Sequence, residues 1–402
     1  MSNLLYDSLF GCHIGDDKPF LIFADGRTIS YDAFLHMATR FANTIKAAGL
    51  TAGDRLAVQV EKSAEALAVY AACVQSGVIF LPLNTAYKPA EVEYFISDSG
   101  ARMLIAGDAE SLQSIAATHN VILHDMAVNG RGSFTNLATK ASDRFAPVPR
   151  NGDDLAAFLY TSGTTGRSKG AMLTQNNLLS NAQTLIEAWR FSEADVLLHA
   201  LPIFHTHGLF VATNIILLAR ASMIFMPKFD VDSVFAVLPQ ATSMMGVPTF
   251  YTRLLDDARL TADSTRHMRL FVSGSAPLLA ETHLQFAERT GQQILERYGM
   301  TETNMNTTNP YEGPRRAGTV GKPLAGVDLK ITDPETGATL EDGAIGQIEV
   351  RGPNVFVGYW NMPEKTREEL REDGFFITGD LGFIDDQGYV QIVGRNKDLI
   401  IA

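Results

Sequence analysis

The sequence predicts an α/β fold made of two αβ subdomains with mostly parallel sheets, followed by a smaller β-rich subdomain. Between about residues 20 and 300, strand-like apolar runs alternate with segments of helical apolar spacing, which is typical of parallel sheets with crossover helices. After about residue 316 the apolar runs become short, and turn residues separate them, which indicates a β-rich section. The chain has 402 residues, of which 46% are hydrophobic, so it can bury large cores.

The first subdomain, about residues 1–150, shows the alternation clearly. RLAVQV (55–60) and VIFLPLN (78–84) are predicted to be buried strands. Between them, residues 63–77 have helical spacing with a serine at the start and a glycine at the end, which are helix start and stop signals. Residues 89–100 form the next predicted helix, because a proline lies at its start where proline is tolerated.

The second subdomain, about residues 151–315, contains five apolar runs that each end at a loop. These runs are LAAFLY, VLLHALP, SMIFMP, MMGVP and RLFVSG. Because ligands of open parallel sheets bind beyond the carboxyl ends of the strands, we expect the site in these loops. The third subdomain, residues 316–394, has the short predicted strands VDLKITD, GQIEVRG, GFFITGD and GYVQIVG.

The composition excludes several classes of function. A net charge of −12 and the lack of a long basic run argue against nucleic acid and anionic membranes as partners. Two cysteines, Cys12 and Cys73, give no disulfide framework, and Cys73 is predicted to be a core residue. The N-terminus has no positively charged leader, and the longest apolar run, GLFVATNIILLA, is too short for a membrane span. We therefore expect a soluble cytoplasmic protein.

The loop YTSGTTGRSKG (160–170) is the most informative stretch. Its glycines allow backbone amides to approach an anion, its hydroxyls add donors, and Lys169 adds a positive charge, a combination that suits a polyphosphate. It does not fit the spacing G-x-x-x-x-G-K-[ST] of a P-loop kinase, and no G-x-G-x-x-G follows the first strand, which counts against a dinucleotide-binding oxidoreductase. A polar surface turn is the alternative for such a stretch alone.

The whole string TSGTTGRSKG resembles the phosphate-binding signature of the adenylate-forming enzymes, which include the acyl-CoA synthetases. Five further motifs resemble the family's in the same region, and their ranges are 202–208 (PIFHTHG), 273–277 (SGSAP), 298–303 (YGMTET), 378–380 (TGD) and 394–400 (GRNKDLI). The resemblance implies the family's large N-terminal domain over residues 1–394. Residues 395–402 would then begin the hinge, with Lys397 at its pivot. From the resemblance we expect that the family's C-terminal cap domain, normally present in cis, is absent from this sequence.

The resemblance also implies the residues that bind ATP and Mg²⁺. Tyr298 would stack on adenine, Asp380 would accept from the ribose hydroxyls, and Glu302 with Thr161 would hold the metal ion. The implied catalytic residues are Thr161, Lys169, His205 and Glu302. The full implied ATP site consists of Thr161, Ser162, Gly163, Thr164, Thr165, Gly166, Lys169, Ser275, Ala276, Pro277, Tyr298, Gly299, Met300, Thr301, Glu302, Asp380 and Arg395.

Arg297 is the best indication of the substrate, since many relatives carry a small uncharged residue before the Tyr-Gly pair. An arginine binds a carboxylate in a two-pronged geometry, so it suggests a second negative charge on the acid. A salt bridge with Glu296 is the alternative. ERYGMTET, MNTT, PRRAGTVGKPL and GVPT together resemble the malonyl-CoA synthetases of the family. The substrate residues that follow are Arg297, His207, Thr249, Met305, Ser273 and Gly274, with Arg253 as a second candidate cation.

The expected activity is therefore that of an AMP-forming acid–thiol ligase. Malonate, or methylmalonate, would be joined to coenzyme A through a malonyl-adenylate, giving malonyl-CoA, AMP and pyrophosphate. The expected partners are these small molecules, with Mg²⁺ as cofactor. The alternatives are another short-chain or aryl acyl-CoA synthetase, or a nucleotide-binding module without catalysis. Because the cap domain would supply a catalytic lysine, we expect this chain alone to bind nucleotide and substrate but to be weakly active or inactive.

Overall fold

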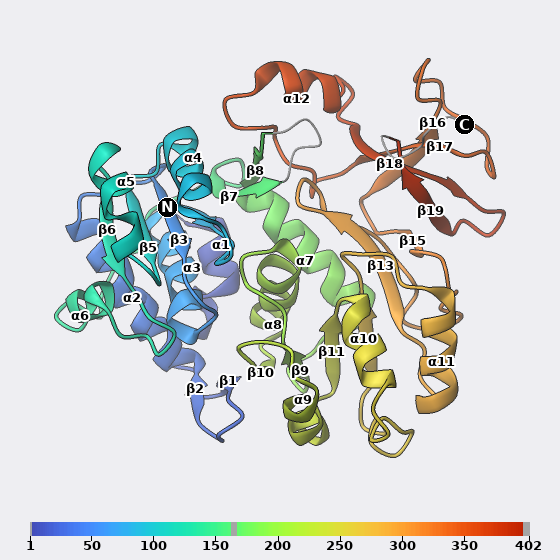
Figure 1. Cartoon of the computed structure of the whole chain (residues 1–402), viewed down its shortest axis with the longest axis horizontal. Coiled ribbons are helices and arrows are strands. Elements are labelled where there is room, and N and C mark those ends of the chain that lie inside the picture. Colours follow the sequence, from blue (N-terminus) through green and yellow to red (C-terminus); the bar gives the residue numbers. More distant parts are fainter. Residues whose placement is uncertain (1, 162–166, 397–402) are drawn as a thin grey trace.

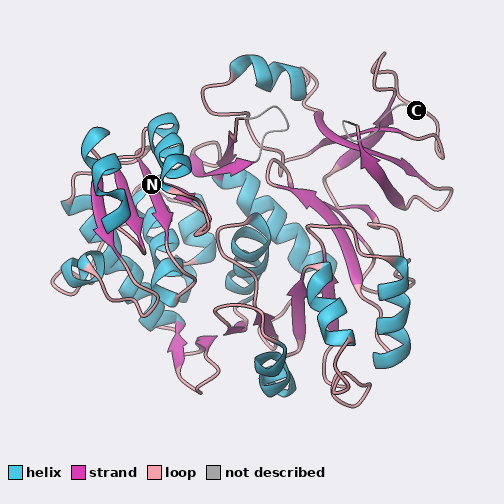
Figure 2. Cartoon of the chain, in the orientation of Figure 1, coloured by secondary structure: helices cyan, strands magenta, loops and turns pink. Residues whose placement is uncertain are grey.

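The computed structural model describes residues 2–161 and 167–396. Three sheets organise the molecule (Figures 1 and 2). The twelve α-helices among the described residues are α1 (Leu4–Leu9), α2 (Tyr31–Ala47), α3 (Ala64–Ser76), α4 (Pro89–Ser99), α5 (Gln113–Thr118), α6 (Ser133–Ala138), α7 (Gln175–Trp189), α8 (Asn214–Ala219), α9 (Val231–Val237), α10 (Pro248–Leu255), α11 (Ala280–Thr290) and α12 (Pro363–Glu369). Short 3₁₀ turns occur at η1 (Gly11–His13), η2 (Glu110–Leu112) and η4 (Leu238–Gln240), and η3 (His207–Thr213) is a π-helix.

The first sheet has six strands, in the order β6-β5-β3-β4-β7-β8. Its strands are β3 (Arg55–Gln59), β4 (Ile79–Pro82), β5 (Met103–Ala106), β6 (Ile122–Asp125), β7 (Leu155–Thr161) and β8 (Lys169–Thr174). All pairs are parallel except β7 with β8. The predicted helix 63–77 is α3, because the Ser63 side chain accepts from Ala66 N–H at the start and Gly77 ends it at φ 71°, a left-handed conformation that suits glycine.

The second sheet has nine strands, in the order β15-β14-β13-β12-β11-β9-β10-β1-β2. Its strands are β1 (Pro19–Ile22), β2 (Thr28–Ser30), β9 (Val196–His199), β10 (Ser222–Phe225), β11 (Ser243–Gly246), β12 (Leu270–Ser273), β13 (Leu295–Met300), β14 (Asn304–Thr308) and β15 (Lys322–Pro323). The strands from β13 through β1 pair in parallel, and β2, β14 and β15 join antiparallel. The predicted α/β class with mostly parallel sheets is confirmed.

Strand membership crosses the boundary that the sequence placed near residue 150. The N-terminal strands β1 and β2 belong to the second sheet, where Leu21 pairs with Met223. Strands β7 and β8 lie after residue 150 and belong to the first sheet. The phosphate-binding motif therefore lies between two antiparallel strands, β7 and β8, which pair with each other.

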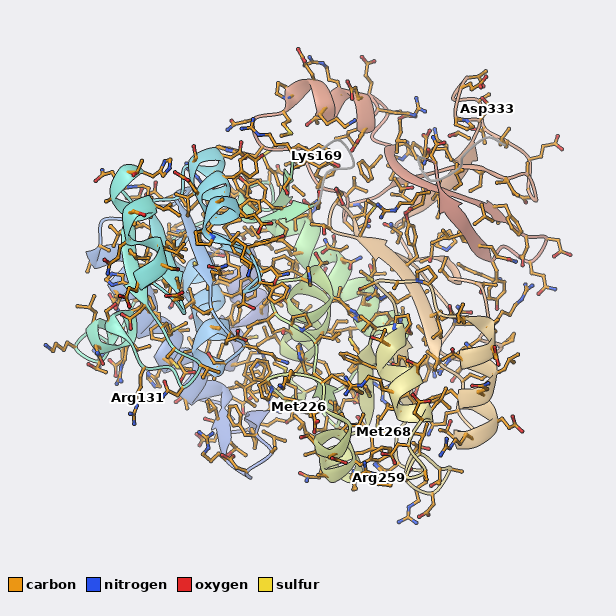
Figure 3. All side chains as sticks on the ribbon, viewed as in Figure 1. Arg131, Lys169, Met226, Arg259, Met268 and Asp333 are labelled. Carbon is orange, nitrogen blue, oxygen red and sulfur yellow. The ribbon has the colours of Figure 1, made fainter. Side chains whose placement is uncertain are left out.

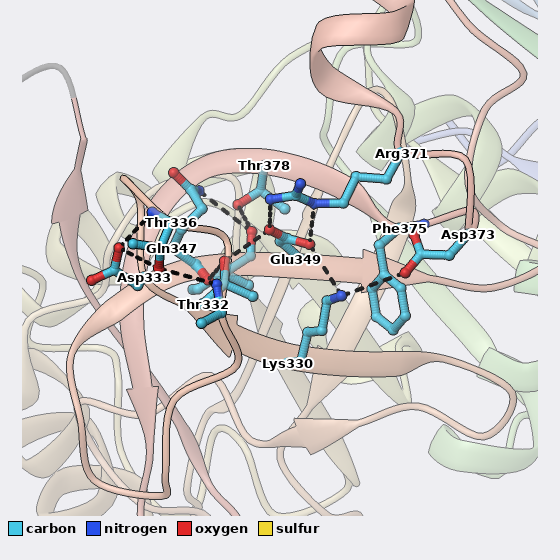
Figure 4. A network of polar contacts seen from close by, with 12 residues as sticks. Lys330, Thr332, Asp333, Thr336, Gln347, Glu349, Arg371, Asp373, Phe375 and Thr378 are labelled. Atoms are coloured by element: carbon cyan, nitrogen blue, oxygen red, sulfur yellow. Dashed lines mark hydrogen bonds and ion pairs between the residues drawn. The ribbon is translucent and has the colours of Figure 1, made fainter.

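The third sheet is small and antiparallel, as the β-rich composition indicated. It contains β16 (Asp328–Thr332), β17 (Gly346–Arg351), β18 (Phe376–Ile384) and β19 (Val390–Arg395). Figure 4 shows Glu349, fully buried on β17, held by Arg371 at 2.6 and 2.8 Å, with Thr332 at 2.8 Å on one of its oxygens. Paired on both oxygens, the buried carboxylate fixes the sheet against the segment after α12.

Helix length and apolar character decide whether a segment can cross a bilayer. Within residues 2–161 and 167–396, no helix is both long enough and apolar enough to do so.

Candidate active site

A cavity of about 630 Å³ opens where the loops of all three sheets meet. Its wall includes the ends of β7 and β8, the segment between β9 and η3, residues of β13, and residues of β18 and β19. Twelve of the predicted site residues line it: Thr161, Lys169, His205, His207, Ser275, Arg297, Gly299, Met300, Thr301, Glu302, Met305 and Arg395. The expectation that the site lies beyond the carboxyl ends of parallel strands is thus met for this cavity.

Arg297 is a buried cation on the cavity wall. It lies on β13, is 3% exposed, and its Nη2 donates to Ser275 Oγ at 3.4 Å. Its Nε has no hydrogen-bond partner, and no carboxylate pairs with it in the part of the chain that the structure describes. Burial lowers the pKa of Arg297 to about 9, so the group is cationic at neutral pH. Glu296 contacts His283 at 3.2 Å instead, so it does not neutralise Arg297.

Gly274 makes room for this arginine. A Cβ atom at position 274 would lie 2.4 Å from Arg297 Cζ and 2.6 Å from its Nε, far closer than van der Waals contact allows. The next residue, Ser275, has a φ of 70°, a left-handed conformation that is strained for serine and often found at functional sites. The strand end at Ser273 therefore turns sharply around the guanidinium.

His207 adds a second polar group beside Arg297. It is buried at the first position of the π-helix η3, and its Nδ1 lies 3.3 Å from Ser275 Oγ. Its Nε2 has no partner among the described residues. Burial and the neighbouring Arg297 hold the pKa of His207 well below its usual range, so the ring is neutral. Ser275 accepts from Arg297 and can donate to Nδ1, which leaves Nε2 as an N–H donor.

The segment that carries His205 and His207 is held from behind by a buried lysine. Lys62 Nζ lies 2.7 Å from His199 Nδ1 and donates to the His199 carbonyl at 2.8 Å. His199 Nε2 in turn lies 2.8 Å from the Gly208 carbonyl. His205, by contrast, is exposed on the cavity wall. The lysine contact therefore fixes the start of η3, and π-helices of this kind are frequent at functional sites.

The opposite end of the cavity is rich in charge. Lys169 Nζ lies 3.0 and 3.2 Å from the two carboxylate oxygens of Glu369 and 3.1 Å from Tyr359 Oη. Tyr359 Oη also contacts Glu302 Oε1 at 3.0 Å, and Thr161 Oγ1 donates to the same oxygen at 3.4 Å. Burial raises the pKa of Glu302. Figure 3 labels Lys169 below α12, the helix that carries Glu369.

A third group of residues joins the second and third sheets. Tyr298 Oη donates to Asp380 Oδ2 at 2.5 Å, and Arg395 Nε lies 3.2 Å from Asp380 Oδ1. Burial raises the pKa of Asp380. Both Tyr298 and Asp380 are buried behind the cavity wall, which Thr378, Gly379 and Arg395 form.

Several predicted residues do not line the cavity. Thr249 is exposed in the first turn of α10, and Val247 is the residue of that loop that faces the cavity. Arg253 does not reach the cavity either, since its guanidinium lies 4.9 Å above the Phe229 ring. The other predicted residues outside the wall are Ser273, Gly274, Ala276, Pro277, Tyr298 and Asp380. Ser162, Gly163, Thr164, Thr165, Gly166 and Lys397 lie outside the described residues.

The sequence interpretation missed three residues at the charged end. Tyr359, Lys365 and Glu369 line the cavity, and all three come from the segment around α12. The only local signal was the i, i+4 spacing of Lys365 and Glu369, which is equally typical of an exposed helix surface.

The cavity combines the hydroxyl of Thr161, the buried acid Glu302 and an arginine without a carboxylate partner among the described residues, a donor set that suits a nucleotide and an acid. The chain belongs to the AMP-binding enzyme family, whose sequence profile matches residues 13–360. It is 36% identical over 413 residues to a malonate–CoA ligase of Arabidopsis thaliana, covering 93% of this chain and 67% of that ligase. The chain spans about two thirds of the length of that relative and of a probable CoA ligase of Humulus lupulus.

Two solved structures are similar over nearly the whole chain. ATP-bound MatB of Rhodopseudomonas palustris is 56% identical with a TM-score of 0.97, covering 100% of this chain and 80% of that one. A malonyl-CoA ligase complex with methylmalonyl-CoA and AMP is 36% identical with a TM-score of 0.80, covering 94% and 78%. The predicted membership among the adenylate-forming acyl-CoA synthetases, and the similarity to malonate-using members, are confirmed.

Proposed function

We propose that this protein joins malonate to coenzyme A at the expense of ATP, through a malonyl-adenylate. The observation that carries the substrate assignment is Arg297, a buried cation that faces the cavity without a carboxylate partner among residues 2–161 and 167–396. A buried unpaired charge costs stability, so its presence favours a ligand that supplies the counter-charge. Malonate has one carboxylate for this arginine and one for the reaction.

The distal carboxylate of malonate accepts hydrogen bonds from the part of the Arg297 guanidinium that lines the cavity, beside His207. Arg297 Nε and His207 Nε2 have no partner among the described residues but are fully enclosed, so the ligand meets the outer nitrogens of the guanidinium. Charge-assisted hydrogen bonds of this kind are roughly twice as strong as neutral ones. A monocarboxylic acid of the same length leaves the charge of Arg297 unpaired, which makes the site selective.

The first half-reaction brings two anions together. The proximal carboxylate oxygen attacks the α-phosphorus of ATP, a P–O bond to the β-phosphate breaks, and pyrophosphate leaves. Lys169 on the cavity wall supplies positive charge where the phosphate oxygens gather. Positioning and electrostatic stabilisation dominate such a step, so no covalent nucleophile of the protein is needed. Cys73 is buried and takes no part.

The second half-reaction transfers the acyl group. The thiolate of coenzyme A attacks the malonyl carbonyl carbon, the bond from that carbon to the AMP phosphate oxygen breaks, and AMP leaves with the electron pair. Arg395 lines the cavity and lies 3.2 Å from the buried Asp380; supported by this carboxylate, Arg395 holds the ribose side of the nucleotide.

A magnesium ion fits the oxygen groups at the charged end. Glu302 is buried, and the hydroxyl of Thr161 lies 3.4 Å from its carboxylate, which is the oxygen chemistry that Mg²⁺ prefers. These two residues would hold the ion, which when bound offsets charge on the phosphate oxygens. We infer both roles from the donor set.

The proposal extends to methylmalonate as a second substrate. The cavity wall includes the apolar residues Leu201, Val247 and Met305 as well as Arg297. One extra methyl group changes discrimination by only about 1–3 kcal/mol. A malonyl-CoA ligase with methylmalonyl-CoA bound supports this extension.

The free cysteines Cys12 and Cys73 fit the predicted cytoplasmic location.

The proposal is tested by ATP–pyrophosphate exchange with acetate, malonate, methylmalonate, succinate and a fatty acid, together with calorimetric binding of each acid in the presence of AMP. We expect malonate to give the highest kcat/KM and the tightest binding, with methylmalonate next. Exchange driven by acetate or a fatty acid, with no response to malonate, would overturn the substrate assignment and leave family membership intact.

A further inference from the structure

Helix α12 carries two charged residues that reach the cavity wall. Lys365 and Glu369 lie one helical turn apart, and both line the cavity. None of the residues of α12 is buried, so the helix is not fixed by a core contact of its own. In Figure 1 it crosses above the β7–β8 hairpin that bears Lys169.

The carboxylate of Glu369 accepts from three donors. Lys169 Nζ lies 3.0 Å from Oε2 and 3.2 Å from Oε1, and Lys365 Nζ lies 2.9 Å from Oε1. Tyr359 Oη lies 2.7 Å from Oε2. Although burial opposes it, hydrogen bonds from Tyr359, Lys365 and Lys169 hold the pKa of Glu369 below its usual range. The group is therefore an anion that two ammonium groups share.

This arrangement differs from an ordinary surface ion pair. The side chains of Lys169 and Glu369 are 13% and 21% exposed, and that of Lys365 is 28% exposed. Partial burial strengthens the pairs relative to exposed ones, which contribute little. Lys365 also contacts the exposed Glu368 at 2.9 Å, so carboxylates balance the charge of the two lysines. A polyphosphate carries more charge than a single carboxylate and can therefore compete with Glu369 for both lysines.

The hydroxyl of Tyr359 adds a competition within the same group. It lies within hydrogen-bond distance of both Glu302 and Glu369, but a phenol has one proton to donate. The two carboxylates therefore cannot both be satisfied by this hydroxyl. When an incoming anion displaces Glu369 from this group, the hydroxyl of Tyr359 can donate its proton to Glu302 alone.

We propose that Lys365 is a second cation for the polyphosphate chain and that Glu369 is an exchangeable counter-ion, which the β- and γ-phosphates of ATP, or free pyrophosphate, displace from Lys169 and Lys365. The inference rests on the proposed use of ATP. Glu369 then sets the affinity for the polyphosphate: by competing for both lysines it weakens ATP binding and also speeds the departure of pyrophosphate.

ATP, pyrophosphate and AMP should differ in how they respond to changes at Glu369. ATP and pyrophosphate contain the groups that would displace Glu369, whereas AMP does not. A change on α12 that merely damages the fold alters binding of all three ligands, but a change in the counter-ion alters only the two polyphosphates.

The test is calorimetric titration of ATP, pyrophosphate and AMP, each with Mg²⁺, into the unaltered protein and the variants Glu369→Gln, Lys365→Met and Glu368→Gln. Glu368 is the matched control, because it contacts Lys365 at 2.9 Å from the same helix but is 65% exposed and does not line the cavity. Thermal unfolding checks that each variant is folded.

We expect Glu369→Gln to tighten ATP and pyrophosphate binding by about fivefold to tenfold, since removing one charge-assisted competitor is worth about that much. Lys365→Met should weaken both polyphosphates by about tenfold. AMP binding should change by less than about twofold in either variant, and Glu368→Gln should change none of the three by more than that. When Lys365→Met is already present, adding Glu369→Gln should have a smaller effect, because one of the two lysines for which the carboxylate competes is gone.

Weaker ATP binding by Glu369→Gln, or unchanged polyphosphate binding by Lys365→Met, would overturn the inference while AMP binding keeps the proposed function in place. If the unaltered protein binds neither AMP nor ATP, the proposed function fails first and the inference fails with it. Tightening of pyrophosphate but not of ATP would restrict the role of Glu369 to the product and overturn its role in ATP binding.

Discussion

The two ends of the cavity hold their cations in opposite ways. At the acid end, Arg297 is almost fully buried and has no carboxylate partner within the described residues. At the polyphosphate end, Lys169 and Lys365 are half-buried and share Glu369. An unpaired buried cation favours one ligand charge at a fixed place and so gives selectivity. A paired cation must exchange partners, which suits a group that has to bind and then leave.

The contrast between the two ends of the cavity is tested most severely by the substitution Arg297→Met. This substitution removes the only charge that we assign to the distal carboxylate, and truncating one member of a buried charged contact costs about 2–5 kcal/mol. We expect kcat/KM for malonate in ATP–pyrophosphate exchange to fall by about a thousandfold. ATP binding, measured by calorimetry, should stay within about twofold, because the lysines at the other end are untouched.

Arg297→Met should also change the free energy of unfolding. Since Arg297 is buried without a counter-charge, its replacement by an apolar side chain should raise the free energy of unfolding by about 1 kcal/mol or more. Arg253→Met serves as the control, because Arg253 lies on Phe229 outside the cavity. A loss of stability in Arg297→Met, or equal losses of malonate use in both variants, would show that Arg297 is a structural residue.

A second way to break the comparison is Gly274→Ala. The added methyl group meets the Arg297 guanidinium at 2.4 Å, and overpacking of this kind costs about 1–3 kcal/mol. We expect malonate to bind roughly ten- to a hundredfold more weakly, with ATP binding nearly unchanged. The measurement is calorimetric titration of malonate and ATP separately. Unchanged malonate binding would mean that the guanidinium is free to move and is not preorganised.

The pH dependence of the two ligands should differ. The pKa of Arg297 is lowered to about 9 by burial, so the cationic form that binds malonate is present below that pH and is lost above it. Malonate affinity should fall by up to about tenfold per pH unit above 9. Titrations between pH 7 and 10 should show this fall for malonate and not for AMP. A parallel fall for both would point to unfolding or to another group.

The smallest expected difference is in salt dependence. Lys169 and Lys365 are more exposed than Arg297, so added salt screens them more strongly. Raising the ionic strength tenfold should weaken ATP binding by about threefold and malonate binding by less than about twofold. Equal responses would indicate that the two ends are shielded alike.

Much of the fold followed from local patterns in the sequence. Helix α3 was predicted because Ser63 and Gly77 are chemical signals that act within one turn. Arg297 was found because it stands in the middle of a motif in which a charge is unusual. Both inferences depended on residues close together in the chain.

The missed features depend on distant contacts. Glu369 meets Lys169 across 200 residues, and nothing in the helix PEKTREE shows which surface it faces. Thr249 was predicted in the pocket, but Pro248 starts α10 directly after Val247, and the helix then carries Thr249 outward. The exchange of strands between the two large sheets could not be predicted either, because the sequence of a strand does not show which other strand it pairs with.

That exchange of strands means that the chain is not a string of separable modules. Cutting near residue 150 would remove β1 and β2 from the sheet they complete, and would leave β7 and β8 without β4. Each large sheet needs chain from both sides of the cut. The two αβ subdomains should therefore melt in one cooperative transition. They should also form late in folding, because Leu21 pairs with Met223 and Phe80 with Ala157, and both pairings close long loops.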